Sequence, residues 1–298
     1  MIRIEDGYVS FEGYRTYYRI ANPEGKKIPL LLLHGGPGST HNSFEVLDEL
    51  ALLDDRPVIS YDQIGCGFSS LQGSHPGLYN KDFWIRELIN LRLKLNLHQV
   101  HLLGHSWGGM LEILYLTERK PFGVVSATLS STLSSASLWK AETHRLLKYL
   151  SAEDQKAVEM AEETGDYQTL EFQLASRHYA ERYVSGPVTE ETPDCVKRSR
   201  LRGEESYLVA WGTSEFTPTG NLAGYEVTDH LKDISCPVLL LSGTDDESTP
   251  YQNKVMYEAL KGEKKWVLLP GARHATYVEK TEDYIREVMA FLNHCEEN

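Results

Sequence analysis

The chain has 298 residues, of which 41% are hydrophobic and 24% charged, and its formal net charge at pH 7 is −13. This length is sufficient for one large core with an inserted segment, or for two modest domains. Because nucleic acids and anionic membrane surfaces repel an acidic protein, the charge argues against both as partners.

The sequence also predicts a cytoplasmic protein with neither a metal site nor a cofactor. Charged residues interrupt the first 20 positions, so no apolar signal-peptide core is expected there. The longest apolar run, 29–33, is far too short to cross a bilayer. The four cysteines are scattered without metal-binding or disulfide-framework spacing, and none of the 11 histidines belongs to an HExxH pattern.

Strands and helices alternate along the first 130 residues. Segments 8–11 and 14–20, joined by Glu12-Gly13, predict an antiparallel hairpin. Solid apolar runs predict buried strands, and apolar residues at helical spacing predict helices between them. The predicted strands are 29–33, 57–61, 100–103 and 123–129, and the predicted helices are 81–97 and 110–119. This rhythm is typical of a parallel sheet with right-handed crossovers.

The alternation of strands and helices stops at residue 131 and resumes near residue 235. The intervening stretch is polar, rich in aromatic residues and helical in pattern, with helices expected around 138–150, 152–163 and 167–183. Strands 237–241 and 265–269 and helices 251–260 and 282–292 follow. We therefore predict an α/β-hydrolase fold with a mostly parallel central sheet, formed by 1–130 and 235–298, and an inserted helical cap at 131–234.

Ser106 is the predicted nucleophile. It lies in Gly104-His105-Ser106-Trp107-Gly108, directly after strand 100–103 and before a helix. A Gly-x-Ser-x-Gly turn in this context presents its serine above the sheet, and the glycines allow a close approach of backbone to backbone.

A serine nucleophile needs a histidine base and a carboxylate that orients the base. In this fold the order along the chain is serine, acid, histidine. His274, just after strand 265–269, has the required order and position. Asp245 and Asp246 both follow strand 237–241, and their spacing alone does not choose between them.

Two convergent amides should stabilise the oxyanion. One is expected at Trp107, and the other in the glycine-rich turn His34-Gly35-Gly36-Pro37-Gly38 after strand 29–33. This turn lacks the Gly-x-Gly-x-x-Gly spacing and the following lysine of a phosphate loop, so we do not expect it to bind phosphate.

Three motifs together resemble the proline iminopeptidase family of α/β-hydrolase serine peptidases. They are the turn at 34–38, the run Asp62-Gln63-Ile64-Gly65-Cys66-Gly67-Phe68-Ser69, and the turn at 104–109. The resemblance extends from the N-terminal hairpin to His274. It implies that the chain releases an unblocked N-terminal residue, often proline, from small peptides.

The resemblance also assigns residues. It implies that Asp246 is the triad acid and that the oxyanion amides belong to Gly36 and Trp107. Glu215, in Glu215-Phe216-Thr217-Pro218-Thr219-Gly220, and Glu247 would hold the free amino group of the substrate. Buried carboxylates suit this task, because a ligand without the ammonium ion leaves them unpaired.

Several points stay open at this stage. Trp107, Trp211, Phe216 and Tyr225 either wall an apolar slot for the first side chain or belong to the core. Cys66 lies either near the nucleophile or in inert, buried surroundings. An amino-acid amidase or ester hydrolase would share every motif, and a non-catalytic binding protein on the same scaffold is a third reading. The sequence does not indicate an oligomeric state.

Overall fold

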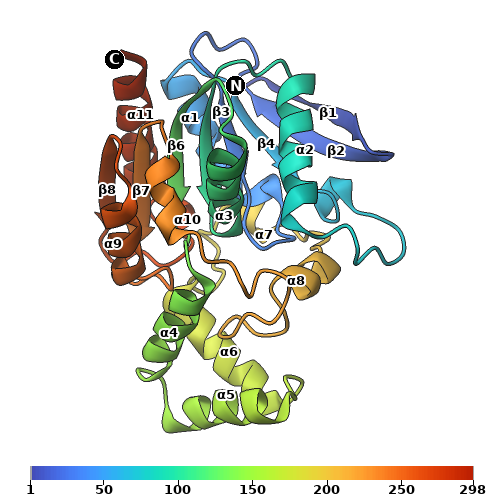
Figure 1. Cartoon of the computed structure of the whole chain (residues 1–298), viewed down its shortest axis with the longest axis vertical. Helices are drawn as coiled ribbons and strands as arrows, with labels where there is room; N and C mark the ends of the chain where they lie inside the picture. The colour runs from blue at the N-terminus through green and yellow to red at the C-terminus, as the bar shows by residue number, and fades with distance from the viewer. Residues whose placement is uncertain (1, 298) are drawn as a thin grey trace.

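The computed structural model describes residues 2–297, and within that range an eight-stranded sheet forms the centre of the molecule (Figure 1). The strand order is β1-β2-β4-β3-β5-β6-β7-β8. β1 pairs with β2 and β2 with β4 in antiparallel fashion, and all remaining pairs are parallel. The strands are β1 Ile4–Phe11, β2 Tyr14–Ala21, β3 Leu30–Leu33, β4 Val58–Asp62, β5 Val100–His105, β6 Val124–Ser130, β7 Val238–Gly243 and β8 Lys264–Leu269. This is the predicted α/β-hydrolase sheet.

Helices cover both faces of the sheet, and β3 shows why its strands are so apolar. Leu31 and Leu33 point into a core shared with α2 Lys81–Lys94, α3 Trp107–Leu114 and α9 Pro250–Ala259. Leu30 and Leu32 point to the opposite core, shared with η1 His41–Leu47, α1 Asp48–Leu53, α10 Thr276–Glu279 and α11 Thr281–Glu297. A strand buried on both faces requires apolar residues at every position.

Two predicted helices have different ends in the structure. α2 stops at Lys94 rather than at residue 97, because Asn96 adopts a left-handed conformation with φ 55° that closes the helix. The helix predicted at 110–119 starts earlier, with α3 at Trp107, and continues after Leu114 as the wider helical turns of η3 Tyr115–Arg119.

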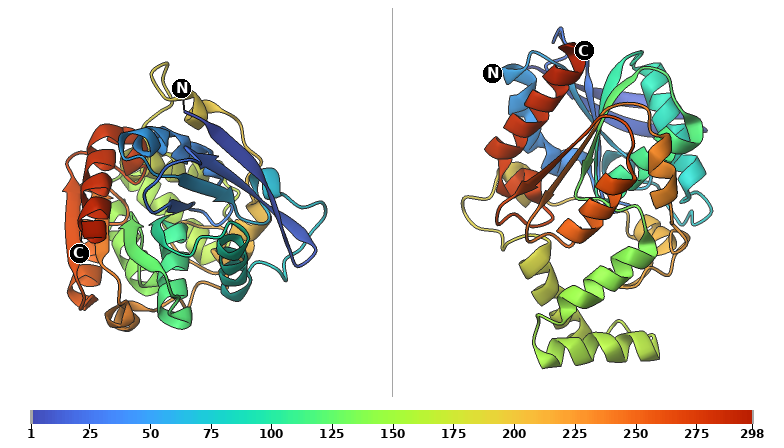
Figure 2. Two further views of the ribbon diagram at one scale, coloured as in Figure 1. Left: turned by 90° about the horizontal axis from the view of Figure 1, so that it is seen from above. Right: turned by 60° about the vertical axis from the view of Figure 1, so that its left-hand side comes forward.

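The segment between β6 and β7 is helical. It contains α4 Ala136–Leu147, α5 Ala152–Thr164, α6 Leu170–Tyr183, α7 Asp194–Lys197, α8 Glu204–Ala210 and η4 Thr228–Asp233. α4, α5 and α6 pack around a small core of their own and project from one end of the sheet (Figures 1 and 2). Within residues 2–297, no helix combines the length and apolar character needed to cross a membrane.

Candidate active site

Ser106 occupies a strained turn between β5 and α3. Its φ of 55° and ψ of −123° lie in a region that residues with a side chain rarely adopt. A Cβ on Gly104 would lie 2.4 Å from the Gly108 carbonyl oxygen, and one on Gly108 would lie 2.0 Å from the Leu33 carbonyl oxygen. Only glycine fits at either position, which explains why this turn carries the Gly-x-Ser-x-Gly pattern.

His274 and Asp246 meet beyond the carboxyl ends of β8 and β7. The Nδ1 of His274 lies 2.8 Å from Oδ1 of Asp246, and both side chains are buried. The backbone N–H of Ser248 donates to the same oxygen at 2.7 Å and fixes the carboxylate. Asp245 is exposed and contacts Thr244 instead. Of the two adjacent aspartates, only Asp246 can therefore orient the imidazole.

The loop that carries His274 is anchored to the inserted helices. The backbone N–H of His274 donates to the Tyr183 carbonyl at 3.0 Å, and that of Ala275 donates to the Val184 carbonyl at 2.9 Å. Ser106 and His274 line the same two cavities. Among residues 2–297 no hydrogen bond joins their side chains, and catalytic contacts of this kind commonly tighten only when substrate binds.

The amides of Gly36 and Trp107 are free to receive an oxyanion. In the described part of the chain neither N–H donates to a protein acceptor. The Trp107 amide opens α3, so the helix dipole reinforces it. The turn of Gly36 lies against the nucleophile, since a Cβ on Gly35 would stand only 3.1 Å from Cβ of Ser106.

Glu247 is buried and Glu215 half-buried, and both lie beside His274. Oε1 of Glu247 lies 3.9 Å from Nε2 of His274, and its Oε2 has no partner among the described residues. Tyr207 donates a short hydrogen bond to the Glu215 carboxylate, and the Trp139 indole donates to the Glu215 carbonyl at 3.0 Å. The two carboxylates therefore form a fixed, incompletely paired acidic site.

Burial dominates the protonation of this cluster. It raises the pKa of Glu215, although the Tyr207 hydrogen bond and the His274 charge oppose it. Burial and then the neighbouring charge of Glu215 raise the pKa of Glu247 well above its usual value. Burial lowers the pKa of His274, but Asp246, followed by Glu247 and Glu215, outweighs it and raises that pKa to about 9. A bound cation would relieve the repulsion between the glutamates.

Two cavities of about 550 Å³ each meet at Ser106 and His274. The first, here named the glutamate cavity, is lined by Glu215, Glu247 and Tyr207. The second cavity is lined by Ser39, Thr40, Ser43, Thr192 and Tyr277, among others. A substrate bound across the junction would place one end in each cavity.

The aromatic residues considered for an apolar slot pack elsewhere. Trp107, Trp211, Phe216 and Tyr225 are all buried, and none lines either cavity. Trp107 packs edge-on against Trp84 at 4.8 Å between ring centroids. The apolar lining of the glutamate cavity instead comes from Pro37, Val184, Tyr207 and Leu208.

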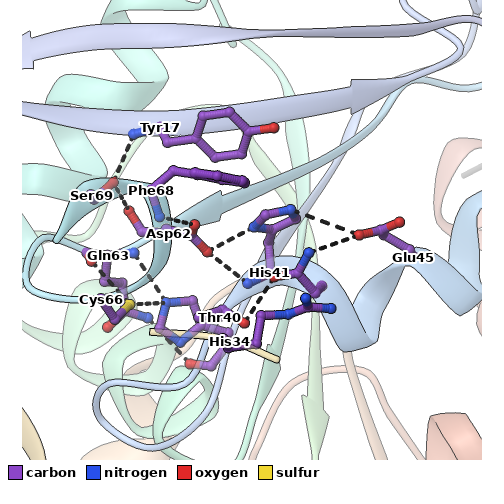
Figure 3. A network of polar contacts seen from close by, with 12 residues as sticks. Tyr17, His34, Thr40, His41, Glu45, Asp62, Gln63, Cys66, Phe68 and Ser69 are labelled. Atoms are coloured by element: carbon purple, nitrogen blue, oxygen red, sulfur yellow. Dashed lines mark hydrogen bonds and ion pairs between the residues drawn. The ribbon is translucent and has the colours of Figure 1, made fainter. Parts of the chain in front are cut away.

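A buried polar network supports the turn at 34–38 from behind (Figure 3). Nε2 of His34 accepts a hydrogen bond from the Gln63 backbone N–H at 3.0 Å. One oxygen of Asp62 lies 2.8 Å from Nδ1 of His41, and the other accepts from the Phe68 N–H, also at 2.8 Å. Sγ of Cys66 lies 3.5 Å from Nε2 of His34.

Burial raises the pKa of the Cys66 thiol well above its usual value, and Cys66 lines neither cavity. We therefore regard it as an unreactive structural residue. His34, Asp62 and Cys66 have potential metal-ligand atoms within 4.8 Å of one another. Since those of His34 and Asp62 already have hydrogen-bond partners, we interpret the group as part of this network.

Sequence reasoning missed Gln63, Tyr207 and Arg202, the last of which lines both cavities. The Gln63 amide donates to the His34 carbonyl at 3.2 Å and accepts from the Trp107 indole at 2.8 Å. It thus joins the two segments that carry the oxyanion amides. Its place in the Asp62–Ser69 motif was the available signal, whereas nothing in the sequence marked the other two.

This fold and this arrangement of serine, histidine and aspartate are those of an α/β-hydrolase serine hydrolase. A family model described as alpha/beta hydrolase fold matches residues 28–281. The chain is 51% identical to the proline iminopeptidase of Clostridioides difficile (strain 630), over 98% of this chain and 99% of that protein. It is 48% identical to the proline iminopeptidase of Lactobacillus helveticus (strain DPC 4571), over 99% of this chain and 100% of that protein.

A solved structure agrees with these sequence relatives. The crystal structure of the Mycobacterium smegmatis proline iminopeptidase superposes with a TM-score of 0.86 at 29% identity, covering 98% of each chain. The chain belongs to the proline iminopeptidase family.

Proposed function

We propose that this protein is a serine aminopeptidase that releases an unblocked N-terminal residue, preferentially proline, from small peptides. The observation that carries the proposal is the pair of glutamates beside the Ser106–His274–Asp246 group: Glu247 is buried, Glu215 is half-buried, and Oε2 of Glu247 has no close hydrogen bond to a described residue. Relatives that carry the name proline iminopeptidase match this chain over nearly its full length, and they support the preference for proline.

In the proposed reaction, His274, oriented by Asp246, removes the proton from Ser106 as the hydroxyl oxygen attacks the first carbonyl carbon of the substrate. The amides of Gly36 and Trp107 stabilise the oxyanion that forms. The tetrahedral intermediate collapses as His274 gives its proton to the leaving amine. Water, activated by the same histidine, then hydrolyses the acyl-enzyme and restores Ser106.

Glu215 and Glu247 give the enzyme its requirement for a free N-terminus. The ammonium group of the substrate enters the glutamate cavity and pairs with both carboxylates. A blocked or internal residue carries no positive charge there, so it leaves the buried Glu247 and the half-buried Glu215 uncompensated. This arrangement restricts cleavage to the first peptide bond.

The second cavity favours a peptidase over an amidase or ester hydrolase with a small leaving group. At about 550 Å³ it has room for the leaving portion of a short peptide. We further propose that residues 131–234 act as a cap over the catalytic residues, supported by the backbone bonds from the His274 loop to Tyr183 and Val184. A cytoplasmic location belongs to the same proposal, and the four free cysteines are consistent with it.

A charge-neutral substitution tests the amine recognition. Glu215→Gln should raise KM for prolyl-β-naphthylamide strongly and leave hydrolysis of an uncharged ester without the amine nearly unchanged. Glu204→Gln is the matched control, because Glu204 lines the same cavity but is exposed. Equal losses on both substrates would mean that Glu215 maintains structure rather than binding the amine.

Ser106 is tested separately from recognition. Wild-type protein should be labelled covalently by a fluorophosphonate, and Ser106→Ala should abolish both labelling and turnover. A labelled Ser106→Ala variant, or one with more than trace turnover on prolyl-β-naphthylamide, would contradict the mechanism. A wild-type protein that is not labelled would support the reading as a binding protein.

A further inference from the structure

Arg202 is the only lysine or arginine among the residues that line the two cavities at the candidate site. It lines both of them, as do Ser106 and His274, so it lies at their junction. Neither the triad nor the pair of glutamates uses it. Its guanidinium stays charged at every pH at which the enzyme would work, unlike the His274 imidazole at the same junction.

The backbone on both sides of Arg202 is fixed to the catalytic part of the molecule. The N–H of Gly67 donates to the Leu201 carbonyl at 2.8 Å, and the N–H of Gly203 donates to the Gly38 carbonyl at 2.8 Å. A Cβ on Gly38 would lie 2.3 Å from the Gly203 carbonyl oxygen, which shows how tightly the two segments pack. Arg202 is thus held next to the turn that supplies the Gly36 amide.

Arg202 differs in its contacts from the two arginines that precede it. Arg198 forms an ion pair with Glu45, and Arg200 donates to the Cys195 carbonyl. Across residues 2–297 the structure gives Arg202 no ion pair or hydrogen bond, and its side chain is exposed. Its guanidinium is therefore available to a ligand that enters the junction.

The charges around the second cavity indicate which ligand group suits it. Its carboxylates are Glu191 and Glu279, and Glu279 is already paired with Arg273. An anionic group that passes Ser106 therefore has one favourable position, at Arg202. A guanidinium offers paired donors that match the two oxygens of a carboxylate.

We propose that Arg202 binds the C-terminal carboxylate of dipeptide and tripeptide substrates and so makes very short peptides the preferred substrates. This inference rests on the proposed function, in which the first residue occupies the glutamate cavity. The leaving portion must then extend into the second cavity. Because an extended residue spans about 3.5 Å, the carboxylate of a dipeptide or tripeptide stays within reach of a side chain at the junction.

The test compares matched substrates that differ only in the terminal charge. Values of kcat/KM are measured for Pro-Gly-Gly and Pro-Gly-Gly-amide, for Pro-Gly and Pro-Gly-amide, and for prolyl-β-naphthylamide. Wild type should prefer the free acids. Arg202→Gln should lower kcat/KM for the acids by about three- to tenfold through KM, as expected for a partly solvated charged pair, and leave the amides and the naphthylamide unchanged. Arg202→Lys should retain part of the preference.

Arg198→Gln is the control, since it removes an exposed arginine of the same segment that lines neither cavity. It should not alter the ratio of acid to amide. If wild type shows no preference for the acids, or if Arg202→Gln affects acids and amides equally, the role of Arg202 is overturned. Failure of the proposed function is a different result: wild type would then hydrolyse no proline-led substrate, the naphthylamide included.

Discussion

In the proposed mechanism, Glu247 links the recognition of substrate to the protonation of the base. Its Oε1 lies 3.9 Å from Nε2 of His274, the nitrogen that must accept the proton of Ser106. With Asp246 and Glu215, it raises the pKa of His274 to about 9 against the opposing effect of burial. These three carboxyl groups therefore favour the protonated imidazole in the free enzyme. An ammonium group bound between the glutamates would weaken this negative field and favour the neutral, basic form.

The pH profile of a variant tests this linkage. Glu247→Gln removes a carboxyl group that raises the pKa of His274, so the histidine should give up its proton at lower pH. With an uncharged ester as substrate, the rising limb of kcat/KM should therefore move to lower pH than in wild type. Glu204→Gln, which removes an exposed carboxylate, should leave the limb in place. An unchanged profile in Glu247→Gln would show that this carboxylate does not influence the base.

The proposed oxyanion site combines two separate elements, the turn after β3 and the first residue of α3. The side chain of Gln63, just after β4, bridges them through the His34 carbonyl and the Trp107 indole. Glycine-rich turns have little side-chain packing to hold them, so such a bridge restricts the spacing of the Gly36 and Trp107 amides.

Gln63→Met should remove the bridge and lower kcat by about tenfold with little change in KM, since the amides act on the transition state rather than on the bound substrate. Affinity for a prolyl boronic acid, whose adduct with Ser106 is tetrahedral, should fall by a similar factor. Gln63→Glu, which keeps the acceptor for the indole, should lose less. A variant in which only KM changes would refute this role for Gln63.

The parts of the site that the sequence predicted are those with a local signal. The turn around Ser106 is specified by its own glycines, and His274 by its order after a strand. Gln63 and Trp107, in contrast, are 44 residues apart in the chain and meet only in the folded protein. Leu201 and Gly203, on either side of Arg202, are likewise hydrogen-bonded to residues far away in the chain, Gly67 and Gly38.

The elements show the same division. Solid apolar runs predicted the buried strands of the sheet, and apolar residues at helical spacing predicted the long helices that pack on it. Both kinds of element are stabilised by apolar burial on defined faces. It did not predict α7 Asp194–Lys197 or α8 Glu204–Ala210, which are short and lie in a polar stretch. Nor could aromatic content identify which side chains wall the cavities, because Phe216 and Tyr225 are as suitable for a core as for a pocket.

At the scale of the whole molecule, the last helix is tied by ion pairs to the segment before β4, at the end of the sheet opposite the candidate site. Arg56, just before β4, is fully buried and pairs with Asp54 and with Glu296 of α11. Both chain termini lie at this end, opposite α4, α5 and α6 (Figure 1). The Ser106 turn, in contrast, follows the carboxyl end of β5. We therefore expect the loss of the Arg56 ion pairs to affect stability and not catalysis.

Arg56→Met should destabilise the folded protein by about 3 kcal/mol, because it leaves the buried carboxylate of Asp54 with fewer partners and breaks the tie to α11. Urea unfolding measures the loss, and kcat on prolyl-β-naphthylamide under folded conditions should be unchanged. Arg86→Met is the control: its ion pair with Glu12 is exposed and screened by solvent, so its loss should cost much less than that of the Arg56 pairs. Similar losses in the two variants would contradict the structural importance of the Arg56 tie. A fall in kcat confined to Arg56→Met would instead show that the two ends of the sheet are coupled.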